Sequence, residues 1–337
     1  MRSKIIALVM LALACGAPAQ AQQAVVTNDQ LVEGAALGNK LLVRTARREL
    51  FEADLTSDQQ KRLFDSNVVD ILRDGDRILI LRHAPPSAAE LMEYRGGEPK
   101  TIATLDLSAD EKSVGLLLTS GGPGILASKS LRVWQDGAWT AKPVHGDFGW
   151  TSSAITADGK AIYTGQNNGE WGGGLYRIDL KTGESKKIER VDDPKEICGY
   201  PLDADCDPVP AMVADPERPD CVYAGVALQH MSSHGRILRV CGETVEVVFE
   251  KKAYPGGRSR ESAAIYGLDI SGKTLWAVSS GALYRIEGSQ QTEIKLPKLE
   301  QTAGLSMARL PGMLVLSTGA NQAFSLSGYT TLLVRLD

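Results

Sequence analysis

The chain of 337 residues is 43% hydrophobic and 23% charged, an ordinary globular composition that excludes an intrinsically disordered protein. Its 37 lysines and arginines face 41 aspartates and glutamates, and the net charge of −4 argues against nucleic acid or an anionic membrane as partner, because both need a basic surface. The 34 glycines outnumber the phenylalanines (5), tryptophans (5) and tyrosines (9) together, which indicates many turns and little helix.

The first 21 residues have the organisation of a secretory signal. Arg2 and Lys4 form a charged start, residues 5–14 are a short apolar run, and Ala19-Gln20-Ala21 fits the small-x-small cleavage rule. The apolar run is too short for a transmembrane helix, and no later stretch reaches the length of a span. We therefore expect no transmembrane segment and a periplasmic or secreted protein.

Cys15 offers an alternative, a lipoprotein anchored at that residue, although Ala12 stands where such anchors usually have leucine. Removing 21 residues from the 337 leaves 316, and the loss of two cations lowers the net charge from −4 to −6. Four of the five cysteines remain, and an even number of cysteines in an exported chain favours disulfides.

Three later stretches share one pattern of turn, strand, loop, strand, turn and strand. They are Asp158–Glu184, Cys221–Glu243 and Ser271–Glu287. Alternating or fully apolar runs of this length, bounded by Gly, Asp and Ser, are typical of β-strands. The pattern predicts an all-β repeat.

The same pair of strands can be placed along the whole chain. An apolar inner strand is expected near Leu41, Ile78, Val114, Ile162, Val222, Leu275 and Leu314. A following strand is expected near Leu50, Met92, Arg132, Tyr176, Leu238, Tyr284 and Leu333. Seven units would have about 45 residues each, the size of a propeller blade, whereas six would have about 53. The first unit fits least well, because Ser57–Phe64 predicts a helix with Ser57 and Gln60 as a capping box.

The two ends of the chain predict a closed ring. The last unit stops at residues 332–337 without room for an outer strand, and the strand-like run Ala24–Thr27 follows the signal. This run can supply the missing strand, which would remove exposed strand edges. We therefore expect one β-propeller domain over residues 22–337, with a pair of β-sandwiches as the structural alternative.

Asp158–Tyr163 and Leu175–Gly183 read D-G-K-x-h-Y and L-Y-R-I-D-x-x-T-G, where h is hydrophobic. These motifs resemble the TolB-type and YVTN-type repeats of periplasmic and secreted β-propellers. The resemblance implies a fold and no particular chemistry.

The four remaining cysteines suggest two disulfides. Cys221 and Cys241 are placed symmetrically about residue 231, so they should face each other across a hairpin. Cys198 and Cys206 then form the second pair, which is our preferred connectivity of three. The alternative is a zinc site that combines these cysteines with His230 and His234, but export and the lack of C-x-x-C spacing weigh against it.

Long polar loops gather on one predicted face. In a propeller, the loops from second to third strand and from one blade to the next emerge on the same side. All four histidines fall in such loops, as does the glycine-rich segment 166–174. Long loops on one face of a rigid scaffold often carry binding residues. The candidate ligand-binding residues are His83, His145, Asn167, Asn168, Glu170, Trp171, His230, His234, Arg258 and Arg260.

Each candidate also has a simpler structural interpretation. Asn167 and Asn168 suit a turn, and His230 and His234 suit surface or hydrogen-bonded positions. Trp171 either stacks on a ligand at the rim or plugs the central channel. Trp134 and Trp139, on either side of a turn, are expected to pack together across two strands.

Two functions remain in competition. The favoured one is an exported, monomeric, non-catalytic propeller that needs no cofactor and binds a protein or small-molecule partner through its long-loop face. The alternative is a lactonase-like or esterase-like hydrolase with calcium and a histidine base. Its oxygen ligands would come from Asp147, Asn167, Glu170, Asp207 and Glu261. The sequence has no G-x-S-x-G, H-E-x-x-H, P-loop or dinucleotide-binding motif.

Overall fold

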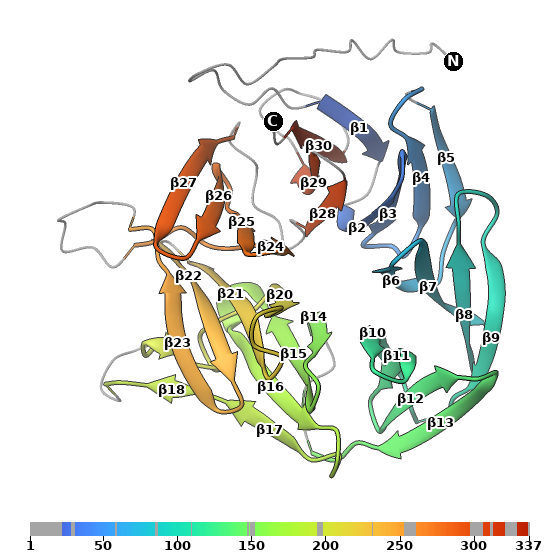
Figure 1. Ribbon diagram of the computed structural model, residues 1–337, viewed down its shortest axis with the longest axis horizontal. Helices are drawn as coiled ribbons and strands as arrows, with labels where there is room; N and C mark the ends of the chain where they lie inside the picture. Colours follow the sequence, from blue (N-terminus) through green and yellow to red (C-terminus); the bar gives the residue numbers. More distant parts are fainter. Residues whose placement is uncertain are drawn as a thin grey trace.

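The computed structural model describes residues 22–27 and 31–335, except 58, 85–86, 109, 147, 149–151, 194–197, 231, 253–260, 297–305, 311–312 and 321–328. In this part of the chain, the regular structure is β apart from one 3-10 helix, η1 (Gly169–Trp171). Seven four-stranded antiparallel sheets surround a common centre (Figure 1). The protein is a β-propeller, as the sequence predicts.

Six of the seven blades are built from four consecutive strands, numbered outward from the centre. Blade 1 contains β2 (Leu31–Leu37), β3 (Lys40–Thr45), β4 (Leu50–Asp54) and β5 (Gln59–Phe64). Blade 2 contains β6 (Val68–Asp74), β7 (Arg77–Ala84), β8 (Ala88–Tyr94) and β9 (Lys100–Asp106). Blade 3 contains β10 (Ser113–Thr119), β11 (Gly122–Ala127), β12 (Ser130–Gln135) and β13 (Ala138–Pro143). Blade 4 contains β14 (Ser152–Ala157), β15 (Ala161–Asn167), β16 (Gly173–Asp179) and β17 (Ser185–Ile188). Blade 5 contains β20 (Ala211–Ala214), β21 (Cys221–His230), β22 (Ser232–Cys241) and β23 (Thr244–Phe249). Blade 6 contains β24 (Gly267–Ser271), β25 (Thr274–Val278), β26 (Ala282–Glu287) and β27 (Gln290–Lys295). Between blades 4 and 5, β18 (Arg190–Val191) and β19 (Pro201–Leu202) pair as a separate small sheet.

The seventh blade joins the two ends of the described chain. It contains β28 (Ser306–Leu310), β29 (Met313–Ala320), β30 (Tyr329–Arg335) and, as its outermost strand, β1 (Gln22–Thr27). β1 runs antiparallel to β30, with Gln22 opposite Leu333 and Thr27 opposite Tyr329. The innermost strands β2, β6, β10, β14, β20, β24 and β28 neighbour one another in a closed ring. Closure by an N-terminal strand is therefore confirmed.

Two details of the predicted repeat are wrong. Residues 59–64 form the outermost strand β5, and Ser57 lies in the preceding turn, because pairing with β4 outweighs the capping-box pattern. Val114 lies on the innermost strand β10 of its blade, and the second strand is β11. The other six predicted inner strands coincide with the second strands of their blades.

The core lies between successive blades, where the faces of neighbouring sheets meet. Among the described residues, buried apolar clusters fill the five interfaces from blade 1 to blade 6. β7 is fully buried from Ile78 to Leu81, which explains its unbroken apolar run. Trp134 and Trp139 face each other across β12 and β13 with ring centroids 5.1 Å apart, so their predicted pairing is confirmed.

Backbone hydrogen bonds define the two faces of the ring. On the side that we call the loop face, the loop after a second strand contacts the connection between blades: His83 N–H donates to Asn67 O at 2.9 Å, and Val209 N–H donates to Gln166 O at 2.7 Å. On the opposite turn face, Gly159 N–H donates to Pro219 O at 3.3 Å, which joins short turns of two neighbouring blades. The predicted sorting of loops is therefore correct for these blades.

The innermost strands of blades 1 to 4 share a β-bulge near the loop face. Each strand has a register shift of one residue against its neighbour, and the residues that follow the bulge are Glu33, Asp70, Gly115 and Ala154. Two carboxylates from these positions reach into the next blade. Glu33 Oε2 accepts the Ile71 N–H at 3.4 Å, and Asp70 Oδ2 accepts the Leu116 N–H. Each carboxylate thus bonds a backbone group beside the next bulge.

Asp70 is partly buried and tightly packed. A Cβ on Gly115 would lie 2.6 Å from Asp70 Oδ2, so the absence of a side chain there makes room for the carboxylate. Burial raises the pKa of Asp70 well above its usual range, and the nearby Glu33 carboxylate raises this pKa further. Arg44, which bonds Glu33 at 2.9 Å, opposes the shift. Asp70 therefore keeps its proton to higher pH in the folded chain than in the unfolded chain.

We expect Asp70→Asn to remove a pH dependence of stability. The raised pKa means that the protonated carboxyl group stabilises the fold fully below about pH 4, the usual pKa of aspartate. This contribution is lost as pH rises through the folded-state pKa. An amide keeps an acceptor for Leu116 N–H and cannot ionise, so the stability of the variant relative to the wild type should increase with pH. Urea unfolding between pH 4 and pH 8 measures this difference.

Asp179→Asn is the matched control with the opposite sign. Backbone N–H groups of Thr182 and Lys181 lower the pKa of Asp179, so its ionised form stabilises the fold. Its substitution should cost stability above about pH 4 and not below its lowered pKa. The prediction for Asp70→Asn is contradicted if the difference in unfolding free energy between this variant and the wild type does not change with pH.

Candidate functional site

Two loops on the loop face lie directly against each other. The first contains residues 167–174 and joins β15 to β16; the second contains residues 198–209 and leads into β20. Together we call them the platform. They meet backbone to backbone: Gly174 N–H donates to Asp207 O at 2.8 Å, and a Cβ on Gly172 would lie 2.0 Å from Asp205 O. This contact explains the run of three glycines after Trp171, since a side chain at Gly172 or at Gly173 would meet backbone atoms.

The first loop is a compact turn with a defined shape. Asn167 Oδ1 accepts the Gly169 N–H at 3.0 Å, Asn168 N–H donates to Gly172 O at 2.9 Å, and Trp171 N–H donates to Asn168 O at 3.2 Å. The side chain of Asn167 therefore supports the turn, as its simpler interpretation predicts. Trp171 ends η1 with its side chain 80% exposed. Such exposure fits an aromatic at the rim and does not fit a packed plug.

The second loop is closed by the disulfide Cys198–Cys206, as predicted. Asp203 organises its interior: one carboxylate oxygen accepts the Gly199 N–H at 2.9 Å, and the other accepts the Asp205 N–H at 3.0 Å. The same loop carries Tyr200, whose side chain remains 37% exposed. Among the described residues, Trp171, Tyr200 and Leu118 are the large apolar side chains with the greatest exposure. Two of these three therefore belong to the platform.

A buried ion pair lies under the platform. Arg236 on β22 donates from Nη2 to Asp207 Oδ2 and from Nε to the carbonyl of Pro201. The residues Asp207 and Arg236 are 2% and 5% exposed. The guanidinium carbon also lies 5.3 Å from the centre of the Tyr200 ring, within cation–π range. Burial raises the pKa of Asp207 to about 6, although Arg236 acts in the opposite direction. The pair anchors the disulfide loop to blade 5.

The structure separates the predicted histidines. His83, at the end of β7, bonds Ser113 Oγ through Nε2 at 3.0 Å, and burial lowers its pKa. His230 ends β21 and His234 lies on β22, opposite Leu228, in the hairpin whose strand β21 neighbours η1. His83, His230 and His234 are therefore on the loop face, in two different blades.

The Val144 N–H donates to Lys129 O at 2.8 Å, in the loop after β11, and His145 follows directly and contacts the next blade. Its backbone N–H donates to Gly183 O at 2.8 Å and its carbonyl accepts the Ser185 N–H at 2.9 Å. These partners flank the short turn between β16 and β17, which belongs to the turn face. The twist of the sheet therefore brings the end of β13 and His145 against the outer turn of the next blade.

Two of the five calcium ligands of the alternative function already bind other parts of the protein. Asp207 is occupied by Arg236 and by the Asp203 N–H at 2.9 Å, and Asn167 is occupied by the turn. Where the structure describes the chain, no three His, Cys, Asp or Glu residues are grouped as a metal site. Asp147, Arg258 and Arg260 lie outside the described residues. Glu170 belongs to η1, and Glu261 is half-buried.

Sequence reasoning missed Tyr200, Arg236 and Ser113. The predicted disulfide Cys198–Cys206 places Tyr200 in a short closed loop, and this was the signal that could have predicted an exposed Tyr200. Arg236 stands inside an apolar strand, and a charged residue there needs a buried partner, but the sequence does not say that Asp207 is the partner. The hydrogen bond between Ser113 and His83 depends on how neighbouring blades are placed around the ring, which no local sequence pattern indicates.

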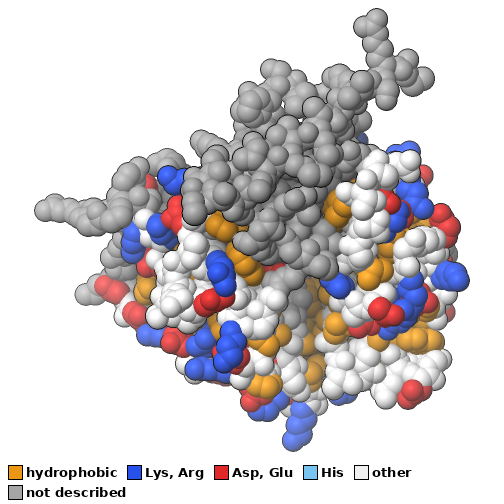
Figure 2. Space-filling model, turned by 45° about the horizontal axis from the view of Figure 1, so that its top comes forward, with side chains coloured by type: hydrophobic (Ala, Val, Ile, Leu, Met, Phe, Trp, Pro, Cys, Tyr) orange, Lys and Arg blue, Asp and Glu red, His pale blue; other side chains and the backbone are white. Residues whose placement is uncertain are grey.

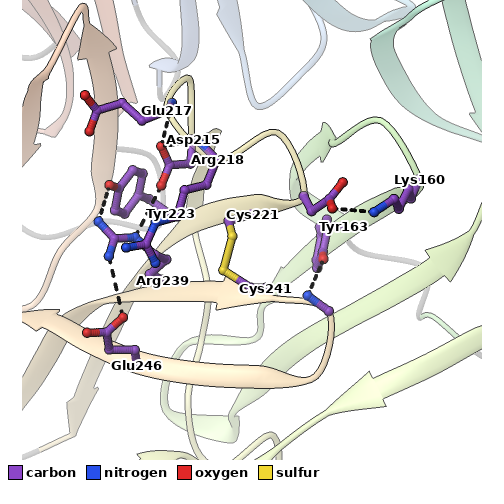
Figure 3. The surroundings of a disulfide bond; sticks show 12 residues. Lys160, Tyr163, Asp215, Glu217, Arg218, Cys221, Tyr223, Arg239, Cys241 and Glu246 are labelled. Carbon is purple, nitrogen blue, oxygen red and sulfur yellow. Dashed lines mark hydrogen bonds and ion pairs between the residues drawn. A yellow bond between two sulfur atoms is a disulfide. The ribbon is translucent and has the colours of Figure 1, made fainter.

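The second disulfide lies far from the platform. Cys221 and Cys241 are directly opposed on β21 and β22 with Cα atoms 4.2 Å apart, so the predicted pairing is confirmed. Figure 3 shows its surroundings, where Arg239 bonds Tyr223 Oη at 2.7 Å and pairs with Asp215 at 3.2 Å. This cluster occupies the turn-face end of blade 5, opposite to the hairpin tip.

Charged side chains are mixed by sign on the visible surface. Figure 2 shows lysine and arginine interspersed with aspartate and glutamate over the described part of that face, without a continuous area of one sign. Among the described residues, no helix is long and apolar enough to cross a membrane.

Comparison with known proteins supports the fold. No protein-family model matches the chain, and no curated protein matches it. Among solved structures, the chain is similar to YCF48 bound to D1 peptide, with 12% identity, a TM-score of 0.58, and coverage of 96% of this chain and 97% of that one. It is also similar to the β-propeller domain of Cps50 (Swd1) from Myceliophteria thermophila, with 12% identity, a TM-score of 0.53, and coverage of 91% and 98%.

A third similar structure is the extracellular domain of a hybrid two component system from B. thetaiotaomicron. The identity is 13% and the TM-score 0.54, and the match covers 91% of this chain but 38% of that one. Identities this low establish the β-propeller class and nothing finer.

Proposed function

We propose that the protein is an exported binding protein that recognises a protein partner through the platform. The observation that carries the proposal is Trp171, an indole 80% exposed on a turn that glycine contacts and hydrogen bonds hold in one shape. Exposed, rigid tryptophan and tyrosine side chains are typical of the residues that dominate binding energy at protein interfaces. Tyr200 adds a second aromatic surface from the adjoining loop.

The form of the platform favours a protein over a small molecule. Small-molecule sites enclose most of the ligand surface in a concave pocket, whereas a side chain as exposed as Trp171 lines no deep pocket. The solved structure of a similar propeller contains a bound peptide, which is consistent with this use of the fold. The signal-like start of the chain and the two disulfides support a periplasmic or secreted location.

We expect Trp171→Ala to weaken partner binding about 30-fold or more, the effect of losing a side chain that dominates an interface. The melting temperature should stay within about 1 °C of wild type, because the exposed indole makes little packing contact. The partner is isolated from the exported fraction with the wild-type protein, purified, and its affinity for both proteins is measured by calorimetry.

Leu118→Ala is the matched control, since Leu118 is 41% exposed on β10, away from the platform. It should leave the affinity unchanged. Equal affinities for wild type and Trp171→Ala would contradict the proposed site. If the melting temperature of Trp171→Ala falls together with its affinity, Trp171 has a structural role. If the purified partner is a small molecule, the proposal of a protein partner is wrong.

A further inference from the structure

The two disulfides of the protein hold different kinds of structure. Cys221–Cys241 joins β21 and β22, which also pair along their whole length from Cys221–Cys241 to His230–Ser232. The ion pairs around Arg239 and the bond from Gly242 N–H to Tyr163 Oη add further links at that end (Figure 3). The position of these strands is therefore set by many bonds besides the disulfide.

Cys198–Cys206 closes a loop that belongs to no blade. Its regular pairing consists of the two-residue strands β18 and β19. The rest of its shape depends on a few backbone bonds, such as Asp192 N–H to Tyr200 O and Asp207 N–H to Asp203 O, on the side chains of Asp203 and Arg236, and on the disulfide. Irregular segments with few ladder bonds open at low free-energy cost, so a covalent closure has a large local effect here.

The Trp171 turn rests on this closed loop. Gly172 lies on the peptide between Asp205 and Cys206, and Gly174 lies on Ala204 and bonds Asp207 O. Cys206 is therefore part of the surface that supports the turn. A change in the path of residues 203–207 would therefore disturb the support of the Trp171 turn.

The two bonds also differ in access. Cys198 and Cys206 are both partly exposed in a surface loop, whereas in the other disulfide Cys241 is partly exposed and Cys221 is only 4% exposed. Thiol–disulfide exchange requires a thiolate to reach a sulfur atom, and the loop disulfide has two partly exposed cysteines where the other disulfide has one.

We propose that the Cys198–Cys206 disulfide is a redox lock on the platform, which assembles the partner site when it forms and releases it when it is reduced. A dithiol reductant attacks one sulfur as a thiolate, forms a mixed disulfide, and leaves as its own disulfide. Two electrons and two protons pass to the protein, where Cys198 and Cys206 become thiols. The propeller itself stays folded, because the blades do not depend on this bond. The effect on binding rests on the proposed function, whereas the effect on loop order does not.

Hydrogen exchange tests the lock without a partner. Cys198→Ser/Cys206→Ser is compared with Cys221→Ser/Cys241→Ser, a matched control that removes the disulfide at the turn-face end of blade 5. We expect the first variant to speed exchange of the amides of Asp192, Gly174 and Asp207 by about tenfold or more, since these donate to Tyr200 O, Asp207 O and Asp203 O across the platform. The control should leave these amides at the wild-type rate.

Unchanged protection of these amides in Cys198→Ser/Cys206→Ser would overturn the lock. Should either variant fail to fold, the wild-type protein is treated with dithiothreitol under native conditions and mapped by alkylation. The proposal requires Cys198 and Cys206 to be labelled before Cys221 and Cys241 while the far-UV circular dichroism is unchanged, and the reverse order contradicts it. A lock confirmed by exchange together with equal partner binding by both redox forms would refute the proposed binding site and leave the lock intact.

Discussion

Replacing Asp207 with alanine should lower the free energy of unfolding by about 3–5 kcal/mol, the cost of leaving a buried charge without its partner. Arg236 is 5% exposed, and Asp207 is its carboxylate partner, so the variant leaves a guanidinium in a site with little water. The Asp203 N–H loses its acceptor as well. The backbone carbonyl that receives Gly174 N–H is retained. Urea unfolding at pH 7.5, where Asp207 is ionised, measures the loss.

Asp192→Ala is the matched control for this prediction. Asp192 pairs with Arg190 at 2.9 Å, but both side chains are about half exposed, so its loss should cost 0–1 kcal/mol, roughly the median for surface ion pairs. A loss below about 1 kcal/mol for Asp207→Ala would mean that Arg236 finds water or another acceptor. The anchor of the disulfide loop would then have to lie elsewhere.

Deleting β1 should be the most damaging single change to the fold. β1 is the outermost strand of blade 7 and pairs with β30, so its removal leaves an unpaired strand edge in the blade that closes the ring. We expect a loss of about 5 kcal/mol or more, comparable with the whole stability of a marginal domain. The expected observations are a broad, weakly cooperative unfolding transition and concentration-dependent aggregation, measured by circular dichroism and light scattering.

Two truncations isolate the effect of this strand. A chain that starts at residue 22 keeps β1, and a chain that starts at residue 28 lacks it. The first should unfold cooperatively, and a synthetic peptide of residues 22–27 should restore part of the lost stability to the second. Equal stability of the two truncations would show that the ring does not need its seventh outer strand.

The fold was predictable because its signals repeat. Short apolar strands bounded by Gly and Asp recur in every blade, and the missing outer strand at the C-terminal end made Ala24–Thr27 the natural partner. The pairing of Cys221 with Cys241 followed from symmetry about one turn. Val114 was misplaced because β10 is as apolar as the second strands of other blades. Ser57–Phe64 was misread because β5 is largely exposed and lacks the alternation that marks a half-buried strand.

The site was less predictable because it depends on contacts between distant residues. Nothing local in the sequence joins Arg236 to Asp207, or Asp70 to the backbone of Leu116, and these contacts follow from the order of blades around the ring. In the sequence, the three glycines after Trp171 mark only a glycine-rich loop. In the structure, a Cβ on Gly172 would meet Asp205, one on Gly173 would meet Gln166, and one on Gly174 would meet Ala204, so close approaches require all three glycines.

The pairing of β1 with β30 also sets a condition on biosynthesis. During translation, β1 leaves the ribosome before every other described strand, and its partner is the last to emerge. Blades 1 to 6 consist of consecutive strands and can form in succession, while β1 has no partner. The ring can therefore close only once the whole chain has been made, so a prematurely terminated product retains an open edge by which proteases can distinguish it from the finished protein.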